Sequence, residues 1–588
     1  MLDPNNRQLL LDALRPEPGV AFDAGVGTSF TLNLDALLLA PLAFALFGTD
    51  DASHDPIALL AAIQQHASKL ALYCDRSHIT TKPSEQKLLV LLEPTIKPVA
   101  APGEGAFHPK LWALRFRRRD GSLAHRLLVL SRNLAFDTSW DLIVSLDESP
   151  DGGLPGEQVA EFLTDLDRLS PSPITKDVAR SIRSVRFDLP EPFDDGRLHS
   201  FGLARSSPDV IGQASGSRGL VVSPFLTAPR LSDLQGLGRN RTLVSTPHEL
   251  ERLGETGVEG WGTPLTLSEN ADAEDGEPTG LRGLHAKLYV TDDGDRSTWF
   301  VGSANATGSA TGRNVETVLE LHGPKRKVGV GALLTTAGSG VQFAHLLEEF
   351  QIVGVEPRPM TAEEEDEERL EELAAKICAG EFQITVAPTG SGFRLFLRRD
   401  GDLIDLGPGD ELYARPVTRK TSRRVDLGGG VIAELEVATA SEITSLVAFQ
   451  LKSGRKTTEP RLFVVQAELI GAPEDRVDRL LVELIPDKRR FALLLFLLLA
   501  AEDSEADIAA RARHLLEGQT DGNGNDGALG IPLYEALVRA SAREPEKLVA
   551  VDKLVTQLCK TEEGASRLPD GFAGMWECFQ PLVKKAAR

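Results

Sequence analysis

One short pattern of side chains occurs twice in this chain, in the same order each time. A His and a Lys two residues apart precede a Ser and an Asn two residues apart. The two copies consist of His108, Lys110, Ser131 and Asn133, and of His285, Lys287, Ser303 and Asn305. Because the complete set is duplicated, the pattern predicts two similar structural halves that build one site together.

Each copy lies in strand-like sequence. Residues 107–114 and 284–290 are short, apolar-rich and bounded by Gly and charged turns, which predicts strands. Side chains two apart on a strand project to the same face, so each His lies beside its Lys. Second strands, at residues 126–130 and 298–301, run into the Ser and Asn of each copy. We therefore expect each half to present one imidazole, one ammonium and one carboxamide at the edge of a sheet.

These residue types suit the cleavage of a phosphodiester. A neutral imidazole can attack phosphorus, and a second, protonated imidazole can give its proton to the departing oxygen. Lysines and Asn amides can stabilise the charge that develops on the non-bridging oxygens. The motifs contain no metal-ligand cluster. The pattern thus predicts a two-step reaction through a phosphohistidine, with no metal and no other cofactor.

The second copy resembles the phospholipase D superfamily. It carries HxK with an Asp five residues further on, then GSxN and NxE, in the form of His285, Lys287, Asp292, Gly302, Ser303, Asn305, Asn314 and Glu316. The first copy keeps HxK but has Arg115 in place of that Asp. Its segment 131–134, with Trp140 downstream, is more similar to the tyrosyl-DNA phosphodiesterase branch. The resemblance extends over roughly residues 20–355.

The resemblance implies an α/β fold in which two α/β/α halves form one pseudo-twofold catalytic unit. It implies the catalytic residues His108, Lys110, Asn133, His285, Lys287 and Asn305, with support from Ser131, Asp141, Asp292, Ser303 and Glu316. His108 would be the nucleophile and His285 the general acid and later base, and the reverse assignment stays open. Glu316 would hold an active-site imidazole in its tautomer, and Asp141 would do so for the first half. Asp292 would be structural.

The remaining sequence predicts further domains. We expect the first half at residues 1–190 and the second at 191–358, with a strand at 87–92. An acidic helical linker follows at 359–380, where eight acids and one Arg occupy positions 363–372. Short alternating strands predict a β-sandwich-like domain at 381–470, and apolar helical spacing predicts a helical domain at 471–588.

Charge limits the way in which this chain can bind nucleic acid. The formal net charge of −22 argues against a protein that coats DNA unaided, because phosphate binding depends on Lys and Arg. Five arginines near the first motif predict a positive mouth for the site: Arg115, Arg117, Arg118, Arg119 and Arg132. A charged, solvated hairpin tip is an equally good interpretation.

Composition also bears on location. Four widely spaced cysteines without a CxxC pair predict reduced thiols. The apolar run at 491–501 is too short to cross a bilayer, and the first residues lack a signal-like stretch. High Arg, Ala and Leu usage suggests a bacterial origin. We expect a cytoplasmic protein with no membrane partner.

Three classes of function compete. The leading hypothesis is a metal-independent nuclease that cleaves DNA, with a role in anti-phage defence suggested by fold analogy alone. Because no Walker motif occurs, an ATP-driven step would belong to a partner, such as a helicase, ATPase or other defence subunit bound through the carboxy-terminal domains. The alternatives are a lipid or small-molecule phosphodiesterase, and an inactive nucleic-acid-binding or scaffold protein of the same fold.

Overall fold

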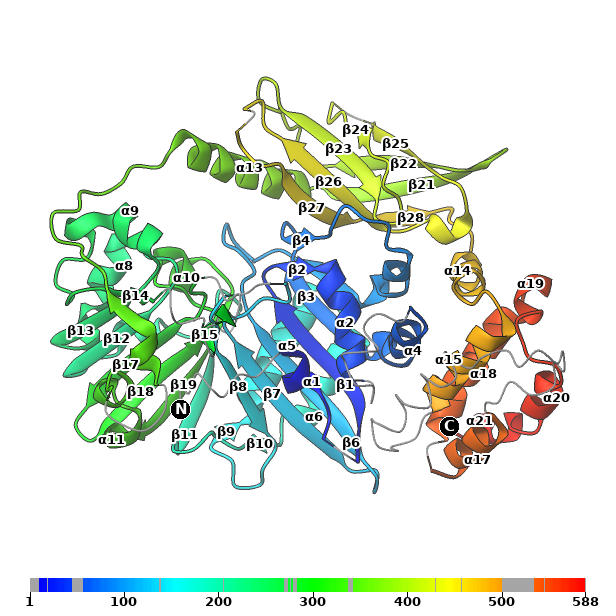
Figure 1. Cartoon of the computed structure of the whole chain (residues 1–588), viewed down its shortest axis with the longest axis horizontal. Helices are drawn as coiled ribbons and strands as arrows, with labels where there is room; N and C mark the ends of the chain where they lie inside the picture. The colour runs from blue at the N-terminus through cyan, green and yellow to red at the C-terminus, as the bar shows by residue number, and fades with distance from the viewer. Residues whose placement is uncertain are drawn as a thin grey trace.

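Two sheets with the same strand order form the framework of the first 350 or so residues. The computed structural model describes residues 10–17, 19–44, 56–136, 139–204, 206–268, 273–274, 277–278, 283–336, 342–428, 430–455, 457–499, 533–543 and 545–586. The fold is mixed α/β, as predicted. In Figure 1 the first half lies at the centre, the second half at the left, the β-rich domain at the top and the carboxy-terminal helices at the right.

The first sheet contains both parallel and antiparallel strands. Its order is β5 (Ile96–Val99), β3 (Leu70–Asp75), β1 (Val20–Ser29), β6 (Leu111–Arg118), β7 (Leu123–Leu130) and β8 (Ile143–Asp147). The pairs β1–β3 and β3–β5 are parallel, and the pairs from β1 through β8 on the other side are antiparallel. Helices cover both faces, because alternate apolar residues of each strand point to opposite sides.

Alternation along β3 shows how the helices divide between the faces. Leu72 and Cys74 pack with α2 (Leu34–Phe44) and α4 (Pro56–His66). Ala71 and Tyr73 face α5 (Gly156–Leu169) and α6 (Pro173–Ile182). The first half is therefore a helix–sheet–helix sandwich.

The second sheet repeats this plan. Its order is β11 (Asp195–Phe201), β19 (Glu316–Pro324), β18 (Arg296–Gly302), β17 (Leu288–Asp293), β12 (Arg218–Val222), β13 (Asn240–Val244), β14 (Leu265–Leu267) and β20 (Leu347–Glu349). Strands β14 to β19 match β5 to β8 in order and in the sense of each pairing. Helices α8 (Ala228–Asp233) and α9 (Pro247–Gly257) cover one face, while apolar residues of the other face join a core that extends into the first half.

Two strand predictions need correction. The HxK motifs precede their strands, since β6 begins at Leu111 and β17 at Leu288. The strand predicted at 87–92 is wrong: Lys87–Leu91 forms a 3₁₀ helix. Helical turns place Leu89 and Leu92, three residues apart, together in the core beside α2 and α4, which an extended segment would not do.

Two further sheets form the β-rich domain. One has the order β25 (Val431–Val437), β22 (Gly392–Asp400), β21 (Glu381–Thr389) and β28 (Glu468–Ile470). The other has the order β24 (Arg423–Arg424), β23 (Glu411–Pro416), β26 (Leu446–Lys452) and β27 (Arg461–Gln466). A single apolar core lies between them, and it includes Leu370, Leu373 and Ile377.

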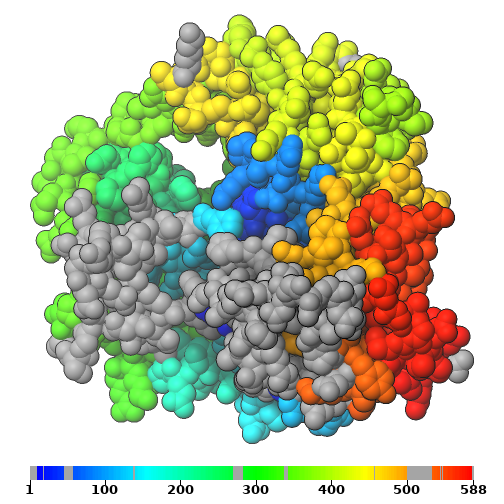
Figure 2. Space-filling model, turned by 45° about the vertical axis from the view of Figure 1, so that its right-hand side comes forward, coloured from blue at the N-terminus to red at the C-terminus, as the bar shows by residue number. Residues whose placement is uncertain are grey.

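Those three residues belong to α13 (Ala362–Cys378), in the segment predicted as an acidic linker. The helix forms, but one of its faces is part of the core, because its apolar residues recur at helical spacing. Figure 2 shows an opening between this part of the chain, the second half and the β-rich domain.

The carboxy-terminal helices pack on the first half. They include α14 (Arg476–Leu484), α15 (Lys488–Leu499), α17 (Leu533–Arg543), α18 (Glu546–Leu558), α19 (Glu562–Ala565), α20 (Phe572–Glu577) and α21 (Gln580–Ala586). Their core also contains Ile57, Leu60 and Ala61 of α4. The apolar cores thus contain residues from more than one predicted domain. The domain boundaries stay predictions. No helix within the described ranges is both long and apolar enough to span a membrane.

Candidate active site

Both HxK motifs lie in extended segments that cross from one half to the other. The amide of His108 donates to the carbonyl of Val315 at 2.9 Å, and the amide of His285 donates to the carbonyl of Trp140 at 2.9 Å. Isolated parallel bridges join Phe107 to Val315 and Trp140 to Leu284. His108 directly follows Phe107, and Glu316 directly follows Val315. In the same way His285 follows Leu284, and Asp141 follows Trp140.

Each imidazole is therefore paired with a carboxylate from the opposite half. Nδ1 of His108 lies 2.8 Å from Oε2 of Glu316, and Nδ1 of His285 lies 2.9 Å from Oδ1 of Asp141. Asp141, expected to orient the imidazole of its own half, bonds to the second half instead. Sequence spacing gave no sign of this exchange, because it depends on the way the two halves dock.

A serine contacts each carboxylate in turn. Ser131 Oγ donates to Asp141 Oδ1 at 2.8 Å and accepts from the amide of Leu142 at 2.9 Å. Ser303 Oγ donates to the carbonyl of Thr317 at 3.2 Å, accepts from the amide of Thr317 at 2.9 Å and helps to lower the pKa of Glu316. Both serines are fully buried. The serine of each motif thus lies beside the acid that orients an imidazole.

The lysines of the two motifs turn back on their own segments. Lys110 Nζ donates to the carbonyl of His108 at 3.0 Å, and Lys287 Nζ donates to that of His285 at 2.5 Å. Burial and the charge of Lys287 lower the pKa of Lys110 well below its ordinary value. Each ammonium is close enough to affect the pKa of both histidines. The two motifs thus converge on one small, charged volume.

The two asparagines have different surroundings. Asn133 Oδ1 accepts from the amide of Thr31 at 3.3 Å. Asn305 Oδ1 is buried and has no hydrogen-bond partner among the described residues. Asn314, the first residue of the NxE element, donates to Glu316 Oε1 at 3.2 Å and accepts from the amide of Ala106 at 3.0 Å. Asn305 therefore has an acceptor left for a group outside the described chain.

Burial sets the protonation of both imidazoles. It lowers the pKa of His108 to about 4, against the opposing attraction of Glu316 and with the help of Lys110 and Lys287. Burial also lowers the pKa of His285, which Asp141 opposes. Burial would raise the pKa of Glu316, but His108, Lys110 and Ser303 lower it overall. A neutral His108 must then donate its Nδ1–H to an ionised Glu316, which leaves the Nε2 lone pair available.

The sequence motifs did not indicate two further polar residues near His108, which are His78 and Asp75. The ring of Phe30 lies 4.7 Å from that of His108 and 3.8 Å from that of His78. His78 Nδ1 contacts Asp75 at 3.1 Å, and Asp75 Oδ2 accepts from the amide of Phe107 at 2.9 Å. The polar residues that directly follow the buried strand β3 were the available signal, since functional side chains often occupy such positions.

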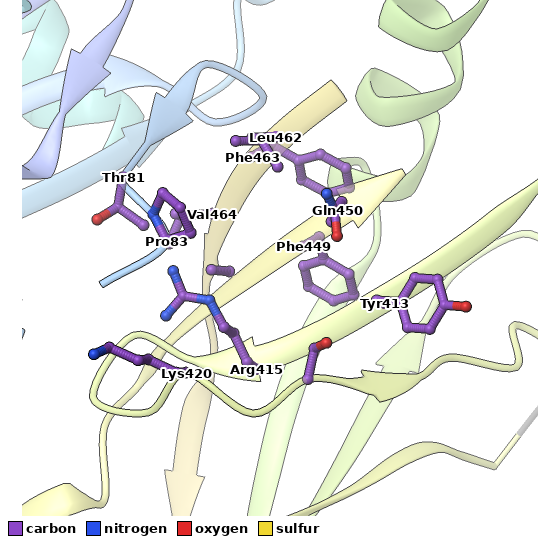
Figure 3. Close-up of a pocket in the computed structure, with 12 residues that line it drawn as sticks. Thr81, Pro83, Tyr413, Arg415, Lys420, Phe449, Gln450, Leu462, Phe463 and Val464 are labelled. Atoms are coloured by element: carbon purple, nitrogen blue, oxygen red, sulfur yellow. The ribbon is translucent and has the colours of Figure 1, made fainter. Parts of the chain in front are cut away.

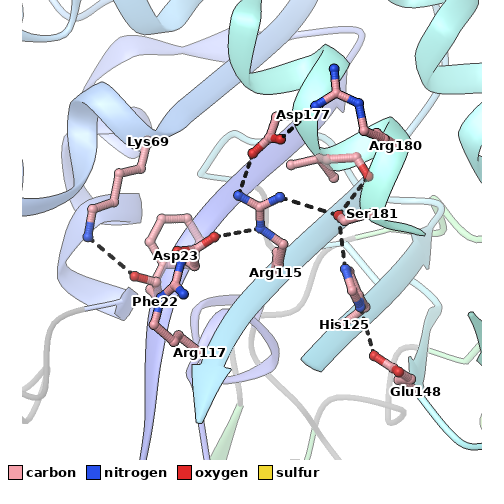
Figure 4. A network of polar contacts seen from close by, with 11 residues as sticks. Phe22, Asp23, Lys69, Arg115, Arg117, His125, Glu148, Asp177, Arg180 and Ser181 are labelled. Atoms are coloured by element: carbon pink, nitrogen blue, oxygen red, sulfur yellow. Dashed lines mark hydrogen bonds and ion pairs between the residues drawn. The ribbon is translucent and has the colours of Figure 1, made fainter. Parts of the chain in front are cut away.

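The arginines expected at the mouth of the site are elsewhere. Arg115 is buried and donates to Asp23 at 2.5 Å and to Asp177 at 2.7 Å, as Figure 4 shows. Arg117 also donates to Asp23, and Arg118 donates to the carbonyl of Leu123. Arg115, Arg117 and Arg118 lie on β6 and Arg119 directly follows it, so they are spread from roughly 17 to 30 Å along the strand from Lys110. Of the five predicted arginines, only Arg132, next to Ser131, lies near the motifs.

The residues five beyond each motif lysine have structural roles. Asp292 is fully buried and accepts from Ser297 Oγ at 2.6 Å and from the amide of Val330 at 3.2 Å. Arg115 holds the equivalent position and ties β6 to α6 through Asp177. The two residues carry opposite charges, but each fastens a strand to a neighbouring helix.

Comparison with known proteins gives weak similarities. No protein-family model and no curated protein matches the chain. A mutant of yeast tyrosyl-DNA phosphodiesterase has a TM-score of 0.33 and 12% identity, covering 54% of this chain and 85% of its own. Polyphosphate kinase from Porphyromonas gingivalis has a TM-score of 0.29 and 12% identity, covering 54% of this chain and 42% of its own.

The site itself is more informative than these values. In the described residues, no group of three or more His, Cys, Asp or Glu side chains is placed to hold a metal ion. Two HxK motifs enter from two sheets of the same strand order and meet through reciprocal imidazole–carboxylate pairs. The matching strand order and the paired motifs are the arrangement that the resemblance to the phospholipase D superfamily implies.

Proposed function

We propose that this chain is a metal-independent phosphodiesterase that cleaves nucleic acid, with DNA as the leading substrate. The observation that carries the proposal is the reciprocal pairing of His108 with Glu316 and of His285 with Asp141. In both pairs the carboxylate binds Nδ1, so both Nε2 atoms are left for the substrate. No described residue forms a hydrogen bond with either Nε2.

The first step forms a bond between His108 Nε2 and phosphorus, while the bond from phosphorus to the leaving oxygen breaks. His285, protonated on Nε2, gives that proton to the leaving oxygen. In the second step His285 takes a proton from water, whose oxygen attacks the phosphohistidine and releases His108. The pKa of about 4 for His108 favours it as the nucleophile, because it is neutral over nearly the whole working range of pH.

The charges of the site suit a phosphodiester. Lys110 and Lys287 bring two positive charges, which Asp141 and Glu316 balance when the histidines are neutral. Burial and then repulsion by Lys287 lower the pKa of Lys110. An incoming phosphate anion would relieve that repulsion and would raise the pKa of both imidazoles. Binding of the substrate thus favours the protonated form that His285 needs.

Nucleic acid is favoured over lipid by the side chains near the nucleophile. Phe30 is only partly buried beside His108, and a base can stack on such a ring. Arg132 adds positive charge next to Ser131. A lipid or small-molecule phosphodiester, or a binding role without catalysis, is the alternative. A cytoplasmic role in bacterial anti-phage defence with a helicase or ATPase partner is part of the proposal and rests on fold analogy.

Cleavage by three proteins tests this function. Wild type, His108→Ala and His285→Ala are incubated in EDTA with end-labelled single-stranded DNA, double-stranded DNA, RNA and phosphatidylcholine. We expect wild type to cut DNA and both variants to lose the activity. His322→Ala is a matched control, because His322 pairs with Glu320 on β19, outside the site. Preferred cleavage of phosphatidylcholine would support the lipid alternative, and equal behaviour of all four proteins would support the non-catalytic one.

A denaturing quench at alkaline pH tests the covalent step separately, because a phosphohistidine is stable in alkali and is hydrolysed in acid. With substrate labelled on the phosphate that is transferred, we expect acid-labile label on wild type and none on His108→Ala. Label that disappears only from His285→Ala would reverse the two roles. A strict requirement for added Mg²⁺ would contradict the mechanism.

A further inference from the structure

A pocket of about 160 Å³ lies between the β-rich domain and the first half, away from both HxK motifs. Its floor is one face of the sheet β23–β26–β27 (Figure 3). The register places Tyr413, Gln450 and Leu462 in one row across these strands, and Arg415, Ala448 and Val464 in the next. Side chains of both rows project to the same face. The wall is the segment after β4 (Ile79–Thr80), with Thr81 and Pro83.

The charge of this pocket is unusual for an acidic chain. Its lining includes Arg415 and Lys420 and no Asp or Glu, although the chain as a whole has a net charge of −22. Arg415 is about nine-tenths buried, with a relative exposure of 8%. Within the described residues, neither cation forms an ion pair with a carboxylate. The pocket therefore contains positive charge without a counter-ion.

Backbone carbonyls are the hydrogen-bond partners of Arg415. Nη1 donates to the carbonyls of Arg419 at 2.8 Å, Ser84 at 3.3 Å and Pro416 at 3.4 Å, and Nη2 donates to that of Lys82 at 3.0 Å. These bonds fix the guanidinium in place but leave its charge uncompensated. Burial lowers the pKa of Arg415 despite the distant attraction of Asp35 and Glu85.

Two hydrogens of the Arg415 guanidinium are unused within the described residues. A guanidinium has five N–H groups in a planar fork. Since Nη1 and one hydrogen of Nη2 are engaged, Nε–H and the second Nη2–H have no partner in the part of the chain that the structure describes. Such a pair of parallel donors matches two oxygens of a carboxylate or phosphate.

We propose that this pocket binds a small organic anion, a phosphate or carboxylate carried on a compact apolar group, through Arg415 and Lys420. The fork of Arg415 would take two oxygens of the anion. Lys420, exposed at the rim, would add a second charge. The apolar group would lie on Ala448, Leu462 and Val464. A volume near 160 Å³ suits a group of about the size of benzene.

Isothermal titration calorimetry on the full chain tests the site with four probes. These are phenyl phosphate, benzoate, inorganic phosphate and the neutral analogue benzamide. We expect phenyl phosphate or benzoate to bind best, and the stronger of the two identifies the anionic group. Benzamide should bind at least about tenfold more weakly, because it has no charge for the guanidinium. No detectable binding of either organic anion at millimolar concentration would overturn the proposal.

Variants locate the binding. Arg415→Lys keeps the charge but loses the fork, so we expect affinity to fall about tenfold. Lys420→Gln changes an exposed side chain and should weaken binding severalfold without affecting the fold, which keeps the test valid if Arg415→Lys folds poorly. Arg424→Gln is the matched control, because Arg424 is exposed on β24, pairs with Glu411 and does not line the pocket. Equal affinity in all variants would overturn the assignment.

One more variant tests whether the probe binds at the proposed catalytic site instead. His108→Ala should bind phenyl phosphate as wild type does, whereas a signal that His108→Ala abolishes belongs to the catalytic site and contradicts this proposal. Equal affinity for inorganic phosphate and phenyl phosphate would also contradict the apolar half of the assignment. None of these results depends on whether the chain cleaves nucleic acid.

Discussion

At the scale of single residues, the proposed chemistry depends on which ring nitrogen of His108 carries the proton. Glu316 is buried and ionised, and it accepts a hydrogen bond from His108 Nδ1. That bond selects the tautomer with a free lone pair on Nε2. Asp141 fixes His285 in the same way. Glu316 and Asp141 therefore act by orienting the two imidazoles. We expect their replacement to lower the rate of the chemical step.

Replacing Glu316 with Gln tests this role. The amide has the same size but can donate to Nδ1, which would favour the wrong tautomer, so we expect kcat to fall roughly 10²- to 10⁴-fold. Steady-state kinetics on the labelled DNA substrate would measure it. Glu320→Gln is the matched control: Glu320 lies on the same strand but pairs with His199 and His322. A similar loss in both variants would point to a general effect on β19.

The pH dependence of kcat/KM gives a second prediction at this scale. His108 must be neutral, so activity is lost as the pH falls through its pKa of about 4. His285 must be protonated, so activity is lost as the pH rises through a pKa that burial holds below 6.5. We therefore expect the optimum of kcat/KM between about pH 4 and 6.5. An optimum above neutral pH would contradict these protonation states.

At the scale of elements, α13 connects the β-rich domain to the segment that precedes the proposed nucleophile, His108. Nε2 of His78 lies 2.5 Å from Glu371 on α13, and Arg461 on β27 also binds Glu371, at 2.6 Å. From His78 the contacts continue to Asp75 and then to the amide of Phe107, directly before His108. Burial would lower the pKa of His78, but Asp75 and Glu371 raise it overall. At pH values below this raised pKa, protonated His78 thus links the first half to the β-rich domain through Glu371.

Glu371→Gln tests the link as a positioning contact. We expect kcat to fall about tenfold, as for other partners that orient a reacting group, with KM nearly unchanged. The defect should shrink as the pH rises through the pKa of His78, because the wild-type link is then lost as well. Parallel pH profiles of the two proteins would measure this. Glu372→Gln, on the exposed face of α13, should behave as wild type.

Several strands and the motif residues were predictable from sequence, whereas contacts between distant residues were not. Strands β7 and β18 were predicted close to their positions, because alternating burial produces a local pattern. The motif residues were found because their order is duplicated. The pairing of Asp141 with His285 was not predictable, since it arises only when Trp140 meets Leu284 across the two halves. The site of Arg115 was missed because partners such as Asp23 and Asp177 are distant in sequence.

At the scale of the whole molecule, apolar cores and ion pairs join the parts. Leu446, Ala448 and Val464 of the β-rich domain lie in a core of the first half. Glu93, in the first half, is 5% exposed and binds Arg476 of α14 at 2.6 Å. It also accepts from Thr444 and Ser445. The β-rich and helical parts therefore meet on a single acid.

Arg476→Leu tests the importance of that contact. The change leaves Glu93 buried without its counter-ion, so we expect the free energy of unfolding to fall by about 3 kcal/mol. Urea unfolding followed by circular dichroism would measure it. Arg479→Leu, on the same helix, removes an exposed pair with Asp475 and should cost less than about 1 kcal/mol. Equal costs would mean that Glu93 finds adequate partners without Arg476.

The reciprocal pairs have a consequence for the history of such a chain. Each copy provides the carboxylate that accepts a hydrogen bond from the imidazole of the other copy. We therefore expect a damaging substitution in one copy to impair both, so that neither copy can become a binding module while the other stays active. Divergence is tolerated where the copies do not depend on each other, as at Arg115 and Asp292. Under the proposed mechanism, the duplicated residues around 108 and 285 have to be retained as a set.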